Sequence, residues 1–110
     1  MKPDPKFLDI VGFEWDRGNI EKNKVKHGVS NQECEEAFFN HPVHLFDDKV
    51  HSGIEERYGI LGKTNVGKRI AVAFTIRGSR VRVISARPQS KKDRLIYSQA
   101  ERNSLGEVKN

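Results

Sequence analysis

The spacing of hydrophobic positions changes once along the chain, from a helical period to strict alternation. In the first part, Cys34, Ala37 and Phe38 fall at i, i+3 and i+4, which places them on one face of a helix. In the second part, the runs RIAVAFTIR (69–77) and RVRVISA (80–86) place apolar residues at alternate positions, as half-buried strands do. The pattern predicts helices first and strands afterwards.

Two helices are predicted in the first part. The run 18–28 gives a short polar helix, with Ile20 and Val25 as its few apolar contacts. The second helix begins after Ser30, because Ser30 and Glu33 have the spacing of a capping box. We expect the two helices to form a hairpin of helices with one apolar side.

An antiparallel meander is predicted from residue 43 onward. Its strands are expected in VHLF (43–46), ERYGILGK (56–63) and the two alternating runs. FEWD, from Phe13 to Asp16, gives a further short strand or an aromatic turn. After Pro88, Ser90 and Asp93 repeat the capping pattern and begin a last helix.

This order of elements predicts an α+β domain with two layers. It combines an antiparallel sheet of about four strands with two N-terminal helices and one C-terminal helix. A chain of 110 residues is long enough for one core and too short for two. We expect a flexible arm at 1–12, a single domain at 13–103 and a frayed tail at 104–110.

The loop Gly78–Ser79 fixes the register of the last hairpin. Counting back from it, Arg77 faces Arg80, and Ala73 faces Ile84. The core face should carry Val72, Phe74, Ile76, Val81 and Val83. The opposite face should be exposed to solvent and carry Ala71, Ala73, Thr75, Arg77, Arg80 and Arg82.

The net charge of +5 and the pI near 9.5 indicate an anionic partner, with nucleic acid ahead of an acidic protein or a membrane surface. The single cysteine, Cys34, excludes an intramolecular disulfide and suits a reducing compartment. No run approaches the roughly 20 apolar residues of a membrane span, so we expect a cytoplasmic protein without membrane contact. Neither a metal-site spacing nor a glycine-rich phosphate loop is present, so no metal and no cofactor are expected.

Arginine and lysine gather where the last strand meets the last helix. Arg82 lies in mid-strand beside alanines, where a planar guanidinium suits a phosphate group. Arg87 would point toward the core if the strand stayed regular, and we expect Pro88 to turn it outward. The residues assigned to RNA or phosphate binding are Lys26, Arg77, Arg80, Arg87, Lys91 and Arg94.

Five segments together are similar to a known family. FEWD, NKVKHGVS, HSGIEERYGILG, GKRIAVAFTIRG and RVISARPQSKKDRLIY resemble, in this order, the BrnT family of toxins over about Phe13 to Tyr97. The chain departs from the usual family pattern at Asn31, where a Phe is common, and at Asp93, where a Glu is common.

The resemblance implies a RelE-like fold and a type II toxin that cuts RNA and halts translation. It implies neutralisation by a cognate BrnA-like antitoxin, with DNA contacted only indirectly through that antitoxin. A homodimer within the complex is compatible with it. The alternative is a non-catalytic module that binds nucleic acid or antitoxin and acts as a co-repressor.

Metal-independent RNA cleavage needs a base for the ribose 2′-OH, an acid for the leaving oxygen and cations on the phosphorane. His27 is the first candidate base, unless it only caps the carbonyls of its helix. Glu56, or Glu55 beside it, is the second, unless the carboxylate forms a surface ion pair. Arg57 and Arg82 are the candidate cations. Tyr97 either stacks on a base or donates a proton, unless it lies in the core.

Overall fold

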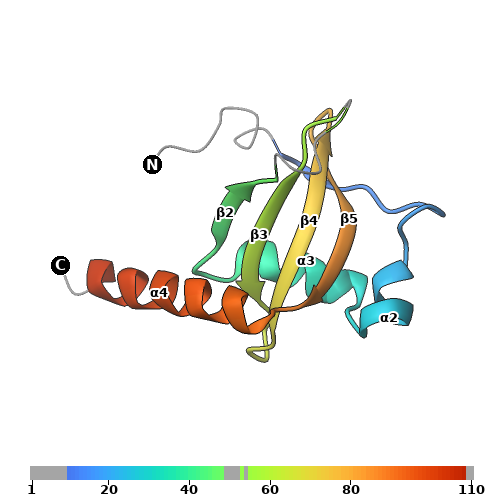
Figure 1. Ribbon diagram of the computed structural model, residues 1–110. Coiled ribbons are helices and arrows are strands. Elements are labelled where there is room, and N and C mark those ends of the chain that lie inside the picture. Colours follow the sequence, from blue (N-terminus) through green and yellow to red (C-terminus); the bar gives the residue numbers. More distant parts are fainter. Residues whose placement is uncertain (1–9, 49–52, 54, 109–110) are drawn as a thin grey trace.

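The computed structural model describes residues 10–48, 53 and 55–108, and within them it shows a five-stranded sheet and three helices (Figure 1). The strands are β1 (Gly12–Phe13), β2 (His44–Asp47), β3 (Tyr58–Lys63), β4 (Arg69–Arg77) and β5 (Arg80–Pro88). The helices are α2 (Lys22–His27), α3 (Asn31–Phe39) and α4 (Lys91–Val108). The strands lie in the order β1-β5-β4-β3-β2, and the predicted α+β class is confirmed.

The sheet is antiparallel except at one edge. β2 to β5 form the predicted meander, in which each strand is antiparallel to the next. β1 adds a fifth strand, which pairs in parallel with β5 through Gly12–Arg80 and Phe13–Val81. FEWD was expected to give a short strand or an aromatic turn at 13–16, and the strand found there, Gly12–Phe13, shares only Phe13 with that segment. The sheet therefore has five strands instead of about four.

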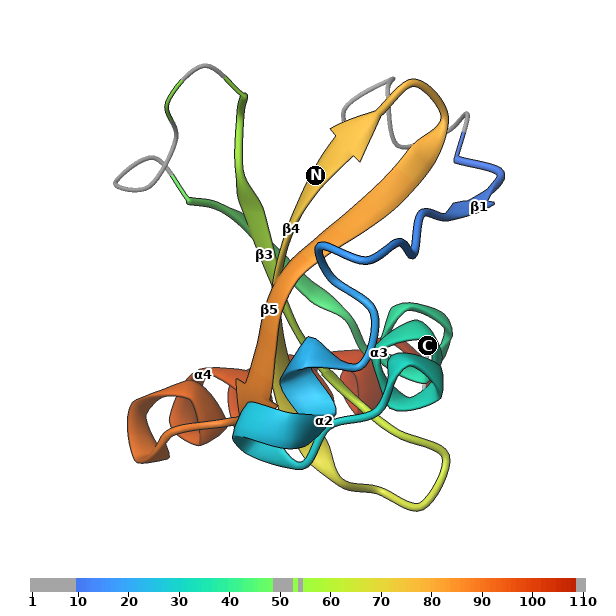
Figure 2. The same ribbon diagram turned by 90° about the vertical axis from the view of Figure 1, so that its right-hand side faces the viewer.

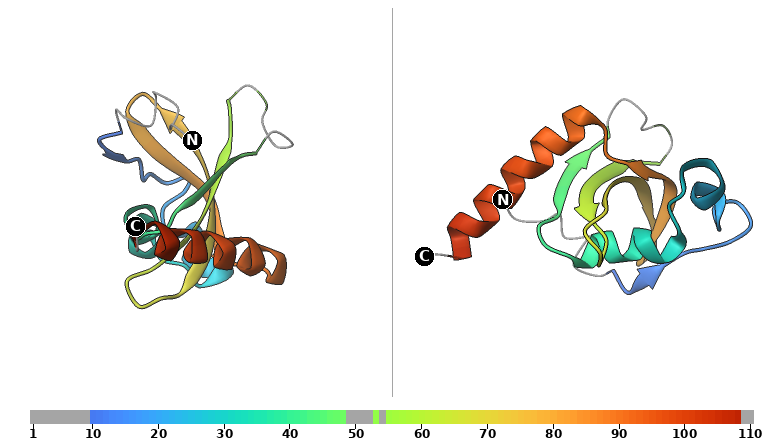
Figure 3. Two further views of the ribbon diagram at one scale, coloured as in Figure 1. Left: turned by 90° about the vertical axis from the view of Figure 1, so that its left-hand side faces the viewer. Right: turned by 90° about the horizontal axis from the view of Figure 1, so that it is seen from below.

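Helices lie on both faces of the sheet (Figure 3). α3 packs on the face that holds the main core, where Cys34 and Ala37 join apolar residues of β3, β4 and β5. α4 crosses the opposite face at one end, where Tyr97 packs against Leu61 and Ala71. Ala71 was expected to be in solvent and is instead buried by this helix. Beyond α4, the described residues place no helix on that face, which we call the open face.

α2 packs beside β5 (Figure 2), but not through the residues that its sequence suggests. Ile20 and Val25 are exposed, whereas Asn19 and Asn23 are buried, so the prediction of an apolar contact was wrong. The side-chain amide N–H of Asn19 donates to the Val83 backbone carbonyl. The side-chain amide oxygen of Asn23 accepts from the Ala86 backbone N–H at 2.9 Å. The two asparagines thus satisfy polar backbone groups of β5 beyond its short pairing with β1.

The hairpin has the predicted register close to its loop and a bulge further along. Arg77 pairs with Arg80, but Ala73 pairs with Ser85 instead of Ile84. Ile84 is therefore an extra residue in β5, and the side chains after it change faces. Ala86 is buried in the core and Arg87 points outward, so the bulge, and not Pro88, turns Arg87 away from the core.

Both predicted capping boxes are present. In α3, the Ser30 hydroxyl accepts from the Glu33 N–H while the Glu33 carboxylate accepts from the Ser30 N–H. Ser90 and Asp93 make the same reciprocal pair at the start of α4. The Asp93 carboxylate thereby fixes the point at which β5 gives way to α4.

The ends of the chain are only partly described. Of the expected arm at 1–12, residues 1–9 lie outside the described residues, while Ile10 packs against the core. Of the expected tail at 104–110, residues 109–110 lie outside them, and α4 continues to Val108. None of the described helices is both long enough and apolar enough to span a bilayer.

Candidate functional site

The open face contains a hollow of about 540 Å³ that is lined by three arginines. Arg77 and Arg82 reach it from β4 and β5, and Arg57 comes from the residue just before β3. We call it the arginine hollow; its lining consists of Gly53, Glu55, Arg57, Thr75, Arg77, Arg82 and Ile84. Thr75 was expected to face solvent but is buried, and its hydroxyl donates to the Glu56 carbonyl.

Arg82 is held by two carboxylates from the segment after β1. Its guanidinium makes a two-point contact with Asp16, at 2.7 and 3.0 Å, and a third bond of 3.1 Å with Glu14. The loop around Asp16 is itself fixed, since the Gly18 N–H donates to the Asp16 carboxylate and the Asp16 N–H donates to Asn19. The Arg82 side chain is only 15% exposed. The anion expected at Arg82 is therefore supplied, in this state, by the protein.

Arg77 is paired in the same way. It donates two hydrogen bonds to Glu55, at 2.9 and 3.0 Å, and lies 3.8 Å from Glu14. Glu14 therefore lies between Arg77 and Arg82 and contacts both. This carboxylate relieves the repulsion between two cations on neighbouring strands of one sheet face.

The ion pairs shift the titration of their carboxylates. The hydrogen bond from Arg82, with a second from the Gly18 N–H, holds the pKa of Asp16 below its ordinary value. The hydrogen bond from Arg77 lowers the pKa of Glu55 in the same way. Both groups are ionised at neutral pH. They suit the binding of cations, but a carboxylate with a lowered pKa is a poor proton donor to a leaving oxygen.

A second hollow, of about 410 Å³, lies on the same face. It shares Arg57 and the bulge residue Ile84 with the arginine hollow. We call it the aromatic hollow; its lining consists of Phe46, Asp48, Arg57, Gly59, Ala71, Val72, Ala73, Ile84, Ser85, Arg87 and Asp93. The two hollows are therefore neighbouring parts of one surface.

Arg87 and Asp93 close the end of the aromatic hollow nearest α4. Arg87 donates to the Asp93 carboxylate at 2.8 Å. Partial burial raises the pKa of Asp93, but bonds from the Ser90 N–H and from Arg87 bring it below the ordinary value. Asp93 therefore joins the helix cap and the Arg87 side chain in one ionised cluster.

The structure brings some predicted site residues together and separates others. Arg57, Arg77 and Arg82 line the arginine hollow, and Arg87 lines the aromatic hollow. Glu56 accepts from the Tyr58 hydroxyl, and Tyr58 belongs to the core on the other face of the sheet. Six further residues line neither hollow: Lys26, His27, Arg80, Lys91, Arg94 and Tyr97.

Tyr97 and His27 illustrate the separation. Tyr97 is fully buried and its hydroxyl donates to the Pro42 carbonyl at 2.8 Å. Burial, together with Glu101, raises the pKa of Tyr97 to about 12. His27 is exposed in the last turn of α2, where Gly28 ends the helix. The Arg69 guanidinium lies over the Tyr97 ring, 5.9 Å from its centroid, but neither Tyr97 nor His27 lines the arginine hollow.

Sequence reasoning missed Glu14, Asp16 and Phe46 as parts of the open face. Glu14 and Asp16 flank Trp15 at positions i and i+2, a spacing that puts two side chains on one side of an extended segment. That spacing was a usable sign of a paired anionic contact. Phe46 follows Leu45 in β2, and alternation alone places the two on opposite faces.

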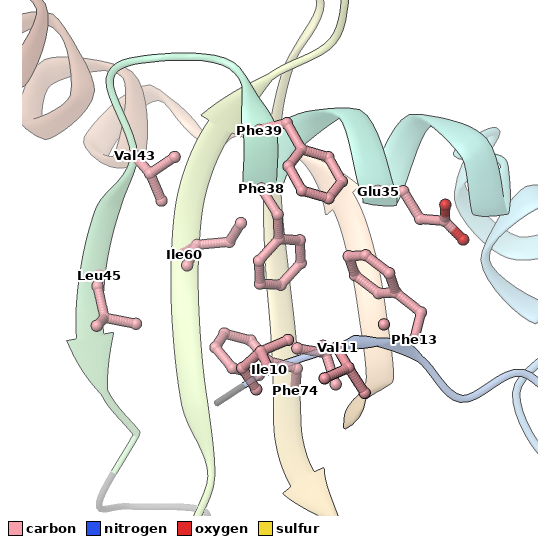
Figure 4. A pocket seen from close by; sticks show the side chains of 12 residues that line it. Ile10, Val11, Phe13, Glu35, Phe38, Phe39, Val43, Leu45, Ile60 and Phe74 are labelled. Atoms are coloured by element: carbon pink, nitrogen blue, oxygen red, sulfur yellow. The ribbon is translucent and has the colours of Figure 1, made fainter. Parts of the chain in front are cut away.

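A third hollow lies on the core face and is a different kind of site (Figure 4). This apolar groove, of about 630 Å³, runs between α3, β2 and the segment of β1. Its lining is apolar except for Glu35, whose carboxylate accepts from the Trp15 indole at 2.7 Å. An anionic ligand would find no cation in this lining. Among the described residues, no cluster of three His, Cys, Asp or Glu side chains could hold a metal ion.

The chain was compared with models of protein families and with curated proteins. A family model described as a ribonuclease toxin, BrnT, of type II toxin-antitoxin systems matches residues 15–93. The matched region begins at Trp15 and ends at Asp93, so it contains the lining of both hollows. Glu14, which contacts Arg77 and Arg82, lies just before it. No curated protein matches the chain.

Proposed function

Because the chain belongs to the BrnT family of ribonuclease toxins of type II toxin-antitoxin systems, we propose that it is a metal-independent endoribonuclease acting at its open face. In this proposal it cleaves RNA in the cytoplasm and thereby inhibits translation. We place the proposed active site here because Arg57, Arg77 and Arg82 all line one hollow.

The arginine hollow has the charge that a phosphate requires. Its lining carries three guanidinium groups and one carboxylate, Glu55. A planar guanidinium binds a phosphate through two parallel hydrogen bonds, as Arg82 already does with Asp16. In the proposed complex, the RNA phosphate takes the place of the Asp16 carboxylate on Arg82.

The proposed reaction is attack of the ribose 2′-OH on the adjacent phosphorus. The 2′-oxygen bonds to phosphorus, its proton leaves to a base or water, and the bond to the 5′-oxygen breaks as that oxygen is protonated. The products are a 2′,3′-cyclic phosphate and a 5′-hydroxyl. Arg57 and Arg82 stabilise the extra negative charge on the phosphorane.

The arginines carry most of the proposed catalysis. His27, Glu56 and Tyr97 do not line the arginine hollow, and Glu55 and Asp16 have lowered pKa values. We therefore assign rate enhancement to positioning and charge stabilisation, with Lys26, Arg80, Arg87, Lys91 and Arg94 as further contacts for the RNA backbone.

A cognate antitoxin is the protein partner, as expected for a toxin of a type II system. We propose that it resembles the BrnA antitoxins, that it brings the complex to DNA, and that the toxin is present there as a homodimer. An analytical ultracentrifugation run of the co-expressed pair measures this stoichiometry directly.

One observation favours a second candidate function, a non-catalytic module that acts as a co-repressor. Arg77, Arg82 and Arg87 are all paired with carboxylates of the chain itself. No described carboxylate in the arginine hollow has a raised pKa that would suit a general acid. Such a module would bind RNA or antitoxin and leave RNA intact.

The deciding experiment incubates the purified protein with end-labelled RNA in EDTA, with and without ribosomes. Arg82→Gln is compared with Arg102→Gln, which removes the same charge from an exposed position of α4. Cleavage by the native protein and by Arg102→Gln, but not by Arg82→Gln, supports the ribonuclease proposal. Binding without cleavage in every sample supports the co-repressor instead. Cleavage retained by a folded Arg82→Gln variant refutes the assigned site.

A further inference from the structure

The aromatic hollow differs in charge from the arginine hollow beside it. Its lining contains two arginines, Arg57 and Arg87, and two carboxylates, Asp48 and Asp93. The formal charges of this lining cancel, so it suits a neutral polar group. The lining of the arginine hollow has an excess of two positive charges. Glu14 and Asp16 balance that excess, so in the proposed function an anion binds there by displacing Asp16 from Arg82.

The aromatic ring of Phe46 forms one wall of the aromatic hollow. The ring belongs to β2, remains 42% exposed, and has the His44 ring 6.2 Å away. Its tip lies on the backbone of Gly59, so close that a Cβ at that position would come within 2.2 Å of it. Glycine at position 59 is thus what allows the ring to lie over the neighbouring strand.

The floor of this hollow is made of small side chains from three adjacent strands. Gly59, Ala73 and Ser85 come from β3, β4 and β5. Ala73 and Ser85 face each other because of the bulge at Ile84, which also turns Arg87 to this face. Together they leave a shallow volume beside an exposed ring, large enough for a planar group to lie against it.

We propose that the aromatic hollow binds a nucleobase of the RNA whose phosphate lies in the arginine hollow. The proposal rests on the proposed ribonuclease function and names a subsite for it. Arg57 lines both hollows, so one nucleotide spans them with its phosphate at Arg82 and its base against Phe46. Stacking on an aromatic ring is the usual way in which proteins hold the bases of single-stranded RNA.

The test measures binding separately from cleavage. The probe is a fluorescent 2′-O-methyl RNA oligonucleotide, which lacks the nucleophile, and its partner is an abasic oligonucleotide with the same number of phosphates. Fluorescence anisotropy at one fixed salt concentration gives the two dissociation constants. Phe46→Leu removes the ring and keeps an apolar side chain, and Phe39→Leu makes the same change on the other face, where Phe39 is 70% exposed.

Phe46→Leu should weaken binding of the base-bearing oligonucleotide about tenfold or more. It should leave the abasic oligonucleotide unchanged, and Phe39→Leu should change neither. A misfolded variant would lose affinity for both probes, and thermal melting checks this independently.

Equal affinities of a folded Phe46→Leu variant and the native protein for the base-bearing probe would overturn the subsite alone. Loss of affinity for the cognate antitoxin, with oligonucleotide binding intact, would assign Phe46 to the protein partner and also overturn it. Failure of the native protein to bind either oligonucleotide would overturn the proposed function and the subsite together.

Discussion

Replacing Asn23 with alanine tests how α2 is attached to the sheet. The Asn23 side chain is 2% exposed, and its oxygen accepts the 2.9 Å bond from the Ala86 N–H. Alanine leaves that N–H buried without its partner, which costs about 1–3 kcal/mol. Alanine also favours a helix over asparagine, by up to about 0.7 kcal/mol. We expect the free energy of unfolding to fall by about 0.3–3 kcal/mol.

Urea unfolding followed by circular dichroism measures this change, and thermal melting repeats it. For a domain of nearly this size, 1 kcal/mol shifts Tm by roughly 4–8 °C. Val25→Ala is the matched control, because Val25 lies in the same helix and is 86% exposed. We expect it to change the free energy of unfolding by less than about 0.5 kcal/mol.

Comparing the loss of stability in the two variants shows which residues attach α2 to the sheet. If its apolar residues held α2 in place, as the sequence suggests, Val25→Ala would be the more destabilising change. A larger loss in Val25→Ala than in Asn23→Ala would therefore refute the attachment of α2 through buried amides to the edge of β5.

Three further predictions concern charge and reactivity. Because its folded pKa is depressed, Asp93 contributes stability that is present above its unfolded pKa of about 4 and is lost as pH falls through the folded value. Acid titration of unfolding should therefore show a smaller loss of stability in Asp93→Asn than in the native protein, and identical curves would contradict the capping cluster. Burial, aided by the charges of Glu33 and Glu35, raises the pKa of the Cys34 thiol to about 12. Iodoacetamide at pH 8 should therefore modify Cys34 only after the protein is unfolded in urea. Rapid labelling of the folded protein would show that α3 does not cover this thiol. Asp16→Asn should strengthen RNA binding and steepen its salt dependence by about 0.7 in the log–log slope, because Arg82 becomes available to one more phosphate. An unchanged slope would mean that phosphate does not compete for Arg82.

The parts of the fold that the sequence predicts are those fixed by neighbours along the chain. The capping boxes at Ser30 and Ser90 need residues only three positions apart, and both are present. The hairpin register follows from the loop Gly78–Ser79 for the four pairs nearest to it. It fails at Ala73 because Ile84 is an extra residue in β5. The sequence alternates only as far as Val83, since Val83 and Ile84 are two adjacent apolar residues.

The candidate site was less predictable, because its contacts join distant parts of the chain. The pair Arg82–Asp16 spans 66 positions, and Arg77–Glu55 spans 22. The pattern placed Arg77 and Arg82 correctly on the face away from the core. The spacing of Glu14 and Asp16 puts both carboxylates on one side of their segment, but it does not show that this segment would reach over the edge of β5. Alternation along a strand shows which side chains lie on each face of the sheet. Ion pairs with distant parts of the chain decide which of those side chains can bind a ligand.

This pairing changes where the excess positive charge of the protein lies. On the open face, Glu14, Asp16, Glu55 and Asp93 stand against Arg77, Arg82 and Arg87. The net charge of +5 is therefore not explained by these arginines. Exposed cations occur instead in α2 and in the first turn of α4: Lys22, Lys24, Lys26, Lys91, Lys92 and Arg94.

The two groups of cations have different physical roles toward an RNA. Exposed lysines attract a polyanion over about a Debye length, roughly 8–10 Å at ordinary salt, and so raise its rate of association. Arg82 binds phosphate only by exchanging Asp16 for it, so its contribution depends on close geometry and appears in the rate of dissociation. Lys24→Gln should therefore slow association with RNA and leave dissociation nearly unchanged in a stopped-flow experiment. Arg82→Gln should do the reverse, and the same kinetic change in both variants would contradict this division.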